Sequence, residues 1–301
     1  MELTGLILGS AIAAGTPVLL AILGEILAQR SGIVNLGLEG AMALGAMTTA
    51  WVQLATGSTV LALIAGSIAG ALLGLTHATL TVVARIQVLA SGLCLFFVGK
   101  GLAGFWGAPI VGRPLPGLPS LRLTVLNEIP FLGPAILSQD IVVYLAIAIA
   151  AVMWWVLFRT NLGLLIQASG ENAEVARAEG VPVVRIRLLC VTVGASLAGL
   201  AGAHIVLGFS HTWLDGIIAG RGWVAIGLVI LARWNPIYAL PCAYVFGGLI
   251  AIQLNAQAAG ISISPYLLSM LPYIVTIAAL TAAHLWSKRT AMPAEVANAE
   301  Q

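Results

Sequence analysis

The sequence predicts an all-α integral membrane protein. Of its 301 residues, 60% are hydrophobic and only 8% are charged, and the mean hydropathy is +1.05. A soluble domain carries about 25% charged residues, so this chain has too few charges to cover a water-facing surface. Its apolar runs are long and do not alternate with period two, which favours membrane helices over a membrane barrel.

Nine runs are candidate spans, because a bilayer core needs roughly 20 apolar residues per helix. They cover residues 4–28, 38–56, 59–84, 88–110, 140–158, 187–209, 222–234, 236–256 and 265–285. The seventh is short and the boundaries are soft, so the prediction is about nine spans, within a range of eight to ten. The first run lacks the basic start of a signal peptide and is too long for one, so it is predicted to be a retained span.

Lysine and arginine residues predict the orientation of the spans. If the N-terminus lies outside, nine of them fall in inner loops or at the C-terminus: Arg30, Arg85, Arg159, Arg177, Arg185, Arg187, Arg233, Lys288 and Arg289. The outer loops then hold three: Arg113, Arg122 and Arg221. This bias predicts an external N-terminus and a cytoplasmic C-terminus. We expect one transmembrane domain, 1–286, with a cytoplasmic segment at 159–187 within it and a polar cytoplasmic tail at 287–301.

A polar, glycine-rich stretch, QRSGIVNLGLEGAMALGAM (29–47), separates the first two spans. It contains three glycines that relax a helix: Gly32, Gly37 and Gly40. The chain is therefore predicted to be broken or re-entrant near 29–38. Non-helical backbone at membrane depth is tolerated only where protein or a water-filled cavity satisfies it. Asn35 can bond the freed amides and carbonyls and Glu39 begins the next span, but whether these side chains also meet a solute stays open.

Ionisable groups inside spans are costly and therefore suggest function. Five are placed there: Glu25, Glu39, His77, Lys100 and His204. The two histidines are more typical of packing residues with satisfied hydrogen bonds than of proton relays. Glu25 lies near Arg30 and can pair with it, whereas Lys100 has no local acidic partner and would need Glu39 or Glu25. The candidates for a solute pathway are Asn35, Glu39, Glu25 and Lys100.

The internal loop at 158–188 is the most polar part of the chain. Within it, the run ENAEVARAEG has Glu174 and Arg177 three residues apart among alanines, which favours a helix of about two turns. Gly180 is expected to cap its C-terminus. So short a helix is marginal in water, and it is either a solvated loop helix or a docking helix for a cytoplasmic partner.

Small residues recur every four positions in two spans, at Gly66, Gly70 and Gly74 and at Gly194, Ala198 and Gly202. This spacing allows membrane helices to approach closely, and we interpret both sets as packing surfaces.

Several chemistries are missing from the sequence. It has no Walker A motif, no H-E-x-x-H, no G-x-S-x-G and no metal-ligand spacing, and its three cysteines lie far apart in apolar runs. A net charge of +2 gives no reason to expect a nucleic-acid partner. We therefore expect no enzyme activity, metal or cofactor in this chain, and any energy for uphill transport would come from a partner that binds nucleotide.

Three blocks of the chain resemble one family. GEILAQRSGIVNLGLEGAMALGA (24–46) is similar to a signature of the permease subunits of bacterial ABC importers for nucleosides and simple sugars, whose more distant relatives carry branched-chain amino acids. ASGENAEVARAEGVPVVRIRLLCVTVGASLAGLAGA (168–203) and GWVAIGLVILARWNPIYALPCAYVFGG (222–248) continue the resemblance. The signature falls on Gly24, Glu25, Arg30, Gly32, Asn35, Gly37, Glu39 and Gly40.

The resemblance implies a permease of the inner membrane that works in a pair around a central pathway. Segment 170–180 would be a coupling helix seated in a cytoplasmic ABC ATPase, with Gly170, Glu171, Asn172, Glu174, Arg177, Glu179 and Gly180 as its coupling residues. ATP would be bound by that ATPase, and an extracytoplasmic binding protein would deliver the solute. Residues 111–139, Asp215 and Arg221 are candidates for the face that receives it.

The solute implied by the resemblance is a nucleoside, a purine-like base, another ribosyl compound or a simple sugar. A different class of function is a secondary transporter or channel that works alone, with a broken helix at 29–38 and a relay between Glu39 and Lys100.

Overall fold

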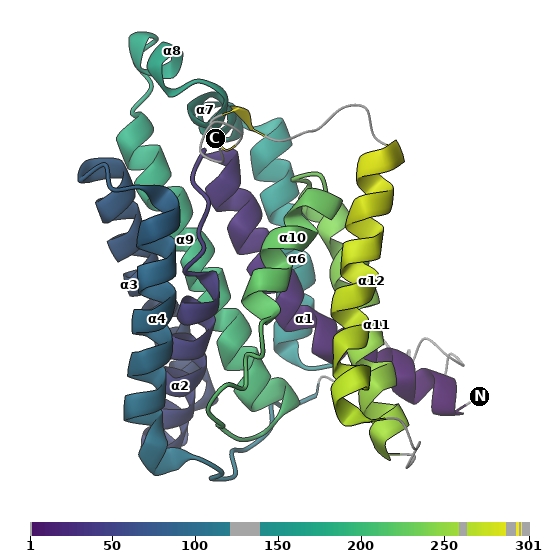
Figure 1. The fold of residues 1–301 in the computed structure, drawn as a ribbon. Helices are drawn as coiled ribbons and strands as arrows, with labels where there is room; N and C mark the ends of the chain where they lie inside the picture. Colours follow the sequence, from purple (N-terminus) through teal and green to yellow (C-terminus); the bar gives the residue numbers. More distant parts are fainter. Residues whose placement is uncertain (1, 121–138, 259–263, 287–292, 295, 297–301) are drawn as a thin grey trace.

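The computed structural model describes residues 2–120, 139–258, 264–286, 293–294 and 296 (Figure 1). Most of the predicted tail at 287–301 and part of the predicted outer loop lie outside the described residues. Within that part of the chain, the secondary structure is helical, apart from two isolated bridges. The elements are α1 (Glu2–Arg30), α2 (Leu38–Thr56), α3 (Thr59–Ala78), η1 (Thr79–Val83), α4 (Val88–Gly107), η2 (Ala108–Ile110), α6 (Ile141–Arg159), α7 (Asn161–Glu171), α8 (Ala173–Ala178), α9 (Val183–His204), η3 (Ile205–Phe209), α10 (Arg221–Leu231), α11 (Pro236–Ala258) and α12 (Pro265–Trp286).

The prediction of an all-α membrane protein is confirmed. Each of the nine predicted spans coincides with a helix, and six helical stretches in the described chain are long and apolar enough to cross a bilayer. These six stretches are formed by α1, α3, α4, α6, α9 and α11, of which α3, α4 and α9 continue into the short helices η1, η2 and η3. Helix α10 has only 11 residues, which agrees with the short seventh span, and α2 carries Glu39 and Gln53, which lower its apolarity.

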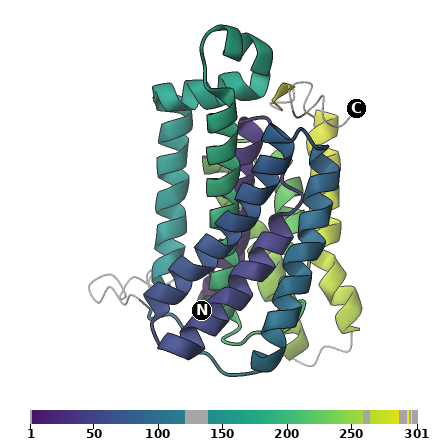
Figure 2. The same ribbon diagram turned by 90° about the vertical axis from the view of Figure 1, so that its left-hand side faces the viewer.

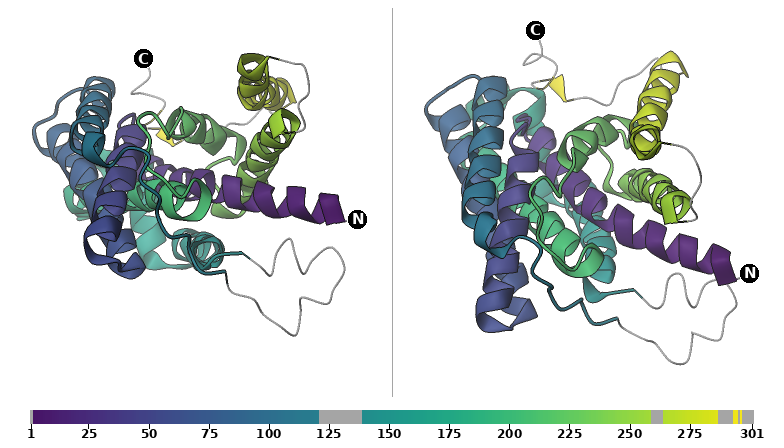
Figure 3. Two further views of the ribbon diagram at one scale, coloured as in Figure 1. Left: turned by 90° about the horizontal axis from the view of Figure 1, so that it is seen from below. Right: turned by 60° about the horizontal axis from the view of Figure 1, so that its bottom comes forward.

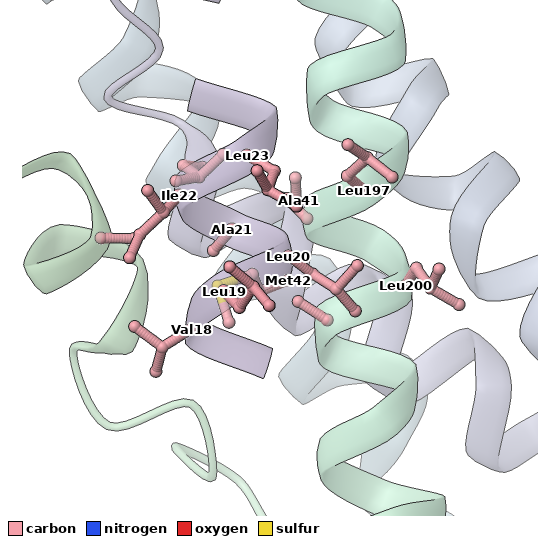
Figure 4. Close-up of a cluster of buried hydrophobic side chains, with 14 of the residues drawn as sticks. Val18, Leu19, Leu20, Ala21, Ile22, Leu23, Ala41, Met42, Leu197 and Leu200 are labelled. Atoms are coloured by element: carbon pink, nitrogen blue, oxygen red, sulfur yellow. The ribbon is translucent and has the colours of Figure 1, made fainter. Parts of the chain in front are cut away.

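Helix α1 runs obliquely through the middle of the bundle (Figure 1). Helices α2, α3 and α4 gather on one side of it, and α11 and α12 lie on the other (Figure 3). Apolar side chains from Val18 to Leu23 meet Met42 of α2 and Leu197 of α9 around α1 (Figure 4). Helix α1 is therefore the core element on which the other helices pack.

Glycines set the closest approaches between these helices. A Cβ atom built on Gly24 of α1 would lie 2.2 Å from the carbonyl oxygen of Gly194 in α9. One built on Gly199 of α9 would lie 2.3 Å from the carbonyl oxygen of Gly66 in α3. Contacts this short leave no room for a side chain, so the packing role predicted for the small-residue spans is confirmed.

Helices α7 and α8 form a hairpin that projects from one end of the body (Figures 1 and 2). The sequence predicted one short helix in this segment, and the structure has two. Asn172 divides them because its side chain accepts hydrogen bonds from the backbone N–H groups of Glu174 and Val175, at 3.1 and 3.0 Å, and so caps α8. Gly180 ends the hairpin with φ +82°, the left-handed conformation that glycine adopts most readily.

The end of the molecule opposite this hairpin is formed by two loop segments that pair with each other. The backbone N–H of Gly112 donates to the carbonyl of Trp213 at 3.0 Å, and Leu115 N–H donates to His211 at 2.9 Å. The described part of the predicted outer loop thus lies against the chain that follows η3, which joins two segments about 100 residues apart in sequence.

We predict that Gly199→Ala lowers the apparent melting temperature of the purified protein, because the new methyl group meets the backbone of α3. Gly101→Ala is the matched control, since Gly101 is also inside a helix but has no atom within 4 Å of a built Cβ. Alanine is favoured over glycine by about 1 kcal/mol in a helix, so the control is expected to melt at the same or a higher temperature. Equal melting of the two variants in detergent would show that the α3–α9 contact tolerates separation.

Candidate functional site

The predicted break between the first two spans is present as a buried non-helical segment. Helix α1 ends at Arg30 and α2 begins at Leu38, and the chain between them enters the body before α2 starts (Figure 1). Gly32 turns the chain with φ +94°, and residues 31–35 are buried. We call residues 31–37 the break. The N–H groups of Ser31, Gly32 and Ile33 donate to carbonyls of the last turn of α1, at 3.0, 2.9 and 3.2 Å, and the remaining backbone groups of the break need partners from elsewhere in the protein.

Glu25 and Asn35 satisfy the middle of the break. The Glu25 carboxylate accepts a hydrogen bond from the backbone N–H of Asn35 at 3.0 Å and another from the Gln29 side chain at 2.8 Å. The Asn35 side-chain oxygen in turn accepts from the backbone N–H of Gly37 at 3.0 Å. The possible pair between Glu25 and Arg30 does not form, because the carboxylate is held by backbone and amide donors instead.

His77 of α3 supports the same segment from another side. Its Nε2 lies 3.1 Å from the carbonyl oxygen of Val34, and its Nδ1 lies 3.0 Å from the Ser91 hydroxyl of α4. The side chain is 1% exposed. The packing interpretation of this histidine is therefore confirmed, with the added finding that it satisfies a carbonyl of the break.

Arg187 joins the break to the α7–α8 hairpin. Its guanidinium donates to the carbonyl of Ser31 at 2.9 Å and to that of Ser169 in α7 at 2.8 Å. The adjacent residue Gly170 packs so closely on the break that a Cβ built there would lie 2.3 Å from the Arg30 carbonyl oxygen. The hairpin and the break are thus in direct contact.

Arg30 and Gln29 tie the end of α1 to the turn between α10 and α11. The Arg30 guanidinium donates twice to the carbonyl of Trp234, at 3.0 and 3.1 Å, and lies 5.4 Å from the ring centre of Phe158. The Trp234 indole N–H donates to the side-chain oxygen of Gln29 at 2.6 Å.

A polar cavity of about 190 Å³ lies between α2, α4 and the chain that leads into α10. Its lining includes Glu39, Phe96, Lys100, Trp213 and Asp215. Lys100 interacts electrostatically with Glu39. Two of the four pathway candidates, Glu39 and Lys100, therefore share one cavity with Asp215. The other two are Asn35, which lies in the break, and Glu25 of α1, which accepts its hydrogen bond.

The two oxygens of Glu39 have different environments. Oε1 accepts a hydrogen bond from the backbone N–H of Gly220, the N-cap of α10, at 2.9 Å. A carboxylate is stabilised at this position by the unpaired N–H groups of a helix N-terminus. Oε2 is buried and has no hydrogen-bond partner among the described residues. Glu39 thus holds the N-terminus of α10 and also belongs to the cavity lining.

The seven coupling candidates lie together at the hairpin. Gly170 and Glu171 end α7, Asn172 caps α8, and Glu174 and Arg177 lie within α8. Glu179 and Gly180 form the turn that follows. Of the signature glycines, Gly40 packs against α4, where a built Cβ would lie 2.9 Å from the Leu95 carbonyl oxygen.

Two features of the site were not found from the sequence. Arg187 was assigned to a loop, but α9 begins four residues earlier and the arginine is 9% exposed. Asp140, which caps α6, also lies 2.9 Å from Nε2 of the fully buried His204. Neither contact has a local sequence signal, because the partners are at least 18 residues apart.

These features together define a class of protein. A membrane permease has these features: a bundle of apolar helices, a broken helix whose backbone hydrogen bonds are made inside the protein, and a polar cavity near the break. A family profile described as "Branched-chain amino acid transport system / permease component" matches residues 6–290. The chain belongs to this family and is an ABC importer permease of the simple sugar and nucleoside type.

Three relatives illustrate the similarity. A putative glucose ABC transporter permease from Haloferax volcanii is 36% identical over 91% of this chain and 90% of its own length. A guanosine ABC transporter permease from Bacillus subtilis is 32% identical, covering 93% and 92%. A nucleoside ABC transporter permease from Lactococcus lactis is 30% identical, covering 88% of each chain. No solved structure matches the chain significantly.

We predict that Arg187→Met destabilises the protein by about 2 kcal/mol, because two buried carbonyls lose a charged donor. The measurement is thermal unfolding in detergent. Arg185→Met is the matched control, since Arg185 is two residues away and exposed. The bridging role of Arg187 would be refuted by equal melting temperatures for the two variants.

Proposed function

We propose that this chain forms part of the solute pathway of an ABC importer and is driven by a separate ATPase that docks on the α7–α8 hairpin. The observation that carries the proposal is the hairpin itself, which projects beyond the spans and is capped at both ends. It exposes Val175, a residue that is 58% accessible, beside the charged residues of α8. A partner groove that covers Val175 would bury apolar surface and hold this short helix in place.

The hairpin end is assigned to the cytoplasm of a bacterial inner membrane by the excess of lysine and arginine in the predicted inner loops. The opposite end, with residues 112–118 paired against 207–213, would then receive an extracytoplasmic binding protein. A second permease, identical or homologous, would complete the pathway. Nucleotide would be bound by the ATPase, so no cofactor is assigned to this chain.

The polar cavity is the proposed solute route through the chain. Lys100 can donate, the exposed carboxylate of Asp215 can accept, and Phe96 offers a ring face. Such a lining suits an uncharged solute with hydroxyl groups and a ring, and the glucose and nucleoside permeases among the relatives lead us to propose a nucleoside, purine-like or simple sugar solute. Membership of the ABC permease family favours this role over that of a transporter working alone.

We predict that Val175→Asp and Glu179→Lys each abolish co-purification of the ATPase and ATP-driven uptake while the permease still inserts in the membrane. The first change places a charge in the buried part of the contact, and the second reverses a charge beside it. Arg113→Glu, a charge reversal in an exposed segment at the opposite end, is expected to leave co-purification intact. Normal co-purification with both hairpin variants would contradict the docking assignment.

We predict that Lys100→Met reduces uptake about tenfold, the effect of losing roughly 1.4 kcal/mol of interaction with the solute. Because Lys100 makes no ion pair within the described structure, assembly with the ATPase is expected to be unchanged. Lys100→Arg keeps the positive charge and is expected to retain more uptake. Unaltered uptake by Lys100→Met would remove this cavity from the pathway.

A further inference from the structure

Residues 215–220 separate two cavities and are not helical. The polar cavity lies on the α2–α4 side of this segment. A second cavity of about 300 Å³, lined by Phe209, Arg221 and Tyr273 among others, lies on the α11–α12 side. Ala219 lines both cavities. We call residues 215–220 the partition.

The backbone of the partition is in conformations that are unfavourable for most residues. Gly216 and Gly220 have φ +74° and +80°, and Ala219 has φ +53°. Glycine tolerates this region, but a residue with a Cβ pays a steric cost there. Ala219 therefore needs external contacts to stay in this conformation.

Two side chains from separate helices supply those contacts. Glu39 of α2 accepts from the Gly220 N–H at 2.9 Å, and the Tyr273 hydroxyl of α12 donates to the Ala219 carbonyl. The two bonds hold adjacent residues at the C-terminal end of the partition to opposite walls, and a third contact comes from Arg221, which donates to the carbonyl of Ile217 at 2.8 Å. The two wall bonds are single hydrogen bonds, so their exchange costs little compared with unfolding a helix.

We propose that the partition is a gate between the two cavities and that Glu39 and Tyr273 are the positioning residues that hold it closed. This inference rests on the proposed solute route through the polar cavity. When α2 and α12 move relative to each other, one bond must break. Residues 215–219 can then move while the Gly220 carbonyl keeps the first hydrogen bond of α10, from the Val224 N–H at 3.1 Å. We call the hydrogen bonds made by Glu39 and Tyr273 the two latches. Both act on backbone groups, so the chemistry of the solute is irrelevant to this step.

The test measures how accessible Ile217, a half-buried residue of the partition, is to a reagent in solution. Ile217→Cys is introduced into the complete transporter with Cys94 and Cys242 replaced by alanine, while the buried Cys190 is kept. A membrane-impermeant maleimide then reports the labelling rate in intact cells. Tyr273→Phe is expected to raise this rate about fivefold, the change expected when one neutral hydrogen bond is lost. Tyr238→Phe is the matched control, because Tyr238 is an exposed residue of α11 outside both cavities.

The second latch is tested by a pair of substitutions at one position. Glu39→Leu removes the acceptor for Gly220 and is expected to raise labelling, whereas Glu39→Gln keeps a carbonyl acceptor and is expected to change it little. Labelling rates equal to the Tyr238→Phe control in both Tyr273→Phe and Glu39→Leu would overturn the proposal. If Glu39→Leu does not fold, Tyr273→Phe decides alone.

A reversible cross-link between the partition and α12 tests the gate independently of the importer assignment. Ala219→Cys and Tyr273→Cys are joined by a short reducible cross-linker in the assembled transporter. Uptake is expected to stop on cross-linking and to return on reduction. Uptake that continues with the link intact would overturn the gate and leave the importer assignment standing. Absence of ATP-driven uptake in the unmodified protein would instead refute the importer assignment, while the labelling rates would still report whether the latches hold the partition.

Discussion

The structure depends on one constraint, which is that the non-helical backbone of the break must find all of its hydrogen-bond partners inside the protein. Unpaired backbone groups cost several kcal/mol each in an apolar medium, by order of magnitude, so the break depends on the donors and acceptors that α1, α3 and α9 deliver to it. Glu25 comes from α1, His77 from α3 and Arg187 from α9. Because each partner belongs to a different helix, the hydrogen bonds that satisfy the break also fix how these helices are placed around it.

The break and the start of α2 also connect the α7–α8 hairpin with the polar cavity, the two regions to which we propose functions. At one end, Arg187 and Gly170 bring the α7–α8 hairpin against the backbone at residues 30–32. Just beyond the other end, Glu39 in the first turn of α2 holds the N-cap of α10 and lines the polar cavity. A displacement of the hairpin would therefore act on the break first and on the cavity wall through α2.

The sequence predicted the helices and the break because both depend on local composition. Apolar length identified the spans, and the glycines near Asn35 marked where a helix could not continue. It did not predict the partners of the break, because those contacts join residues far apart in the chain. Arg187 is an example. It was interpreted as a loop charge, because basic residues near the end of a span are normally assigned to solvent. Likewise, the prediction that Glu25 could pair with Arg30 rested on their charges alone. It left out the backbone N–H of Asn35, which donates to the Glu25 carboxylate.

The distribution of close packing and cavities shows which part of the molecule has room to move. Glycine contacts join the backbones of α1, α3 and α9 with no space for a methyl group, and Gly247 of α11 packs in the same way on α1. The partition, α10 and α12 are different, because cavities lie beside all three, including one of about 190 Å³ lined by Leu228, Cys242 and Val275. Close-packed interiors transmit displacement as rigid units, whereas elements beside voids can shift with little loss of contact. The α1–α3–α9 block is thus suited to move as a rigid unit, and the α10–α12 side is suited to shift against it.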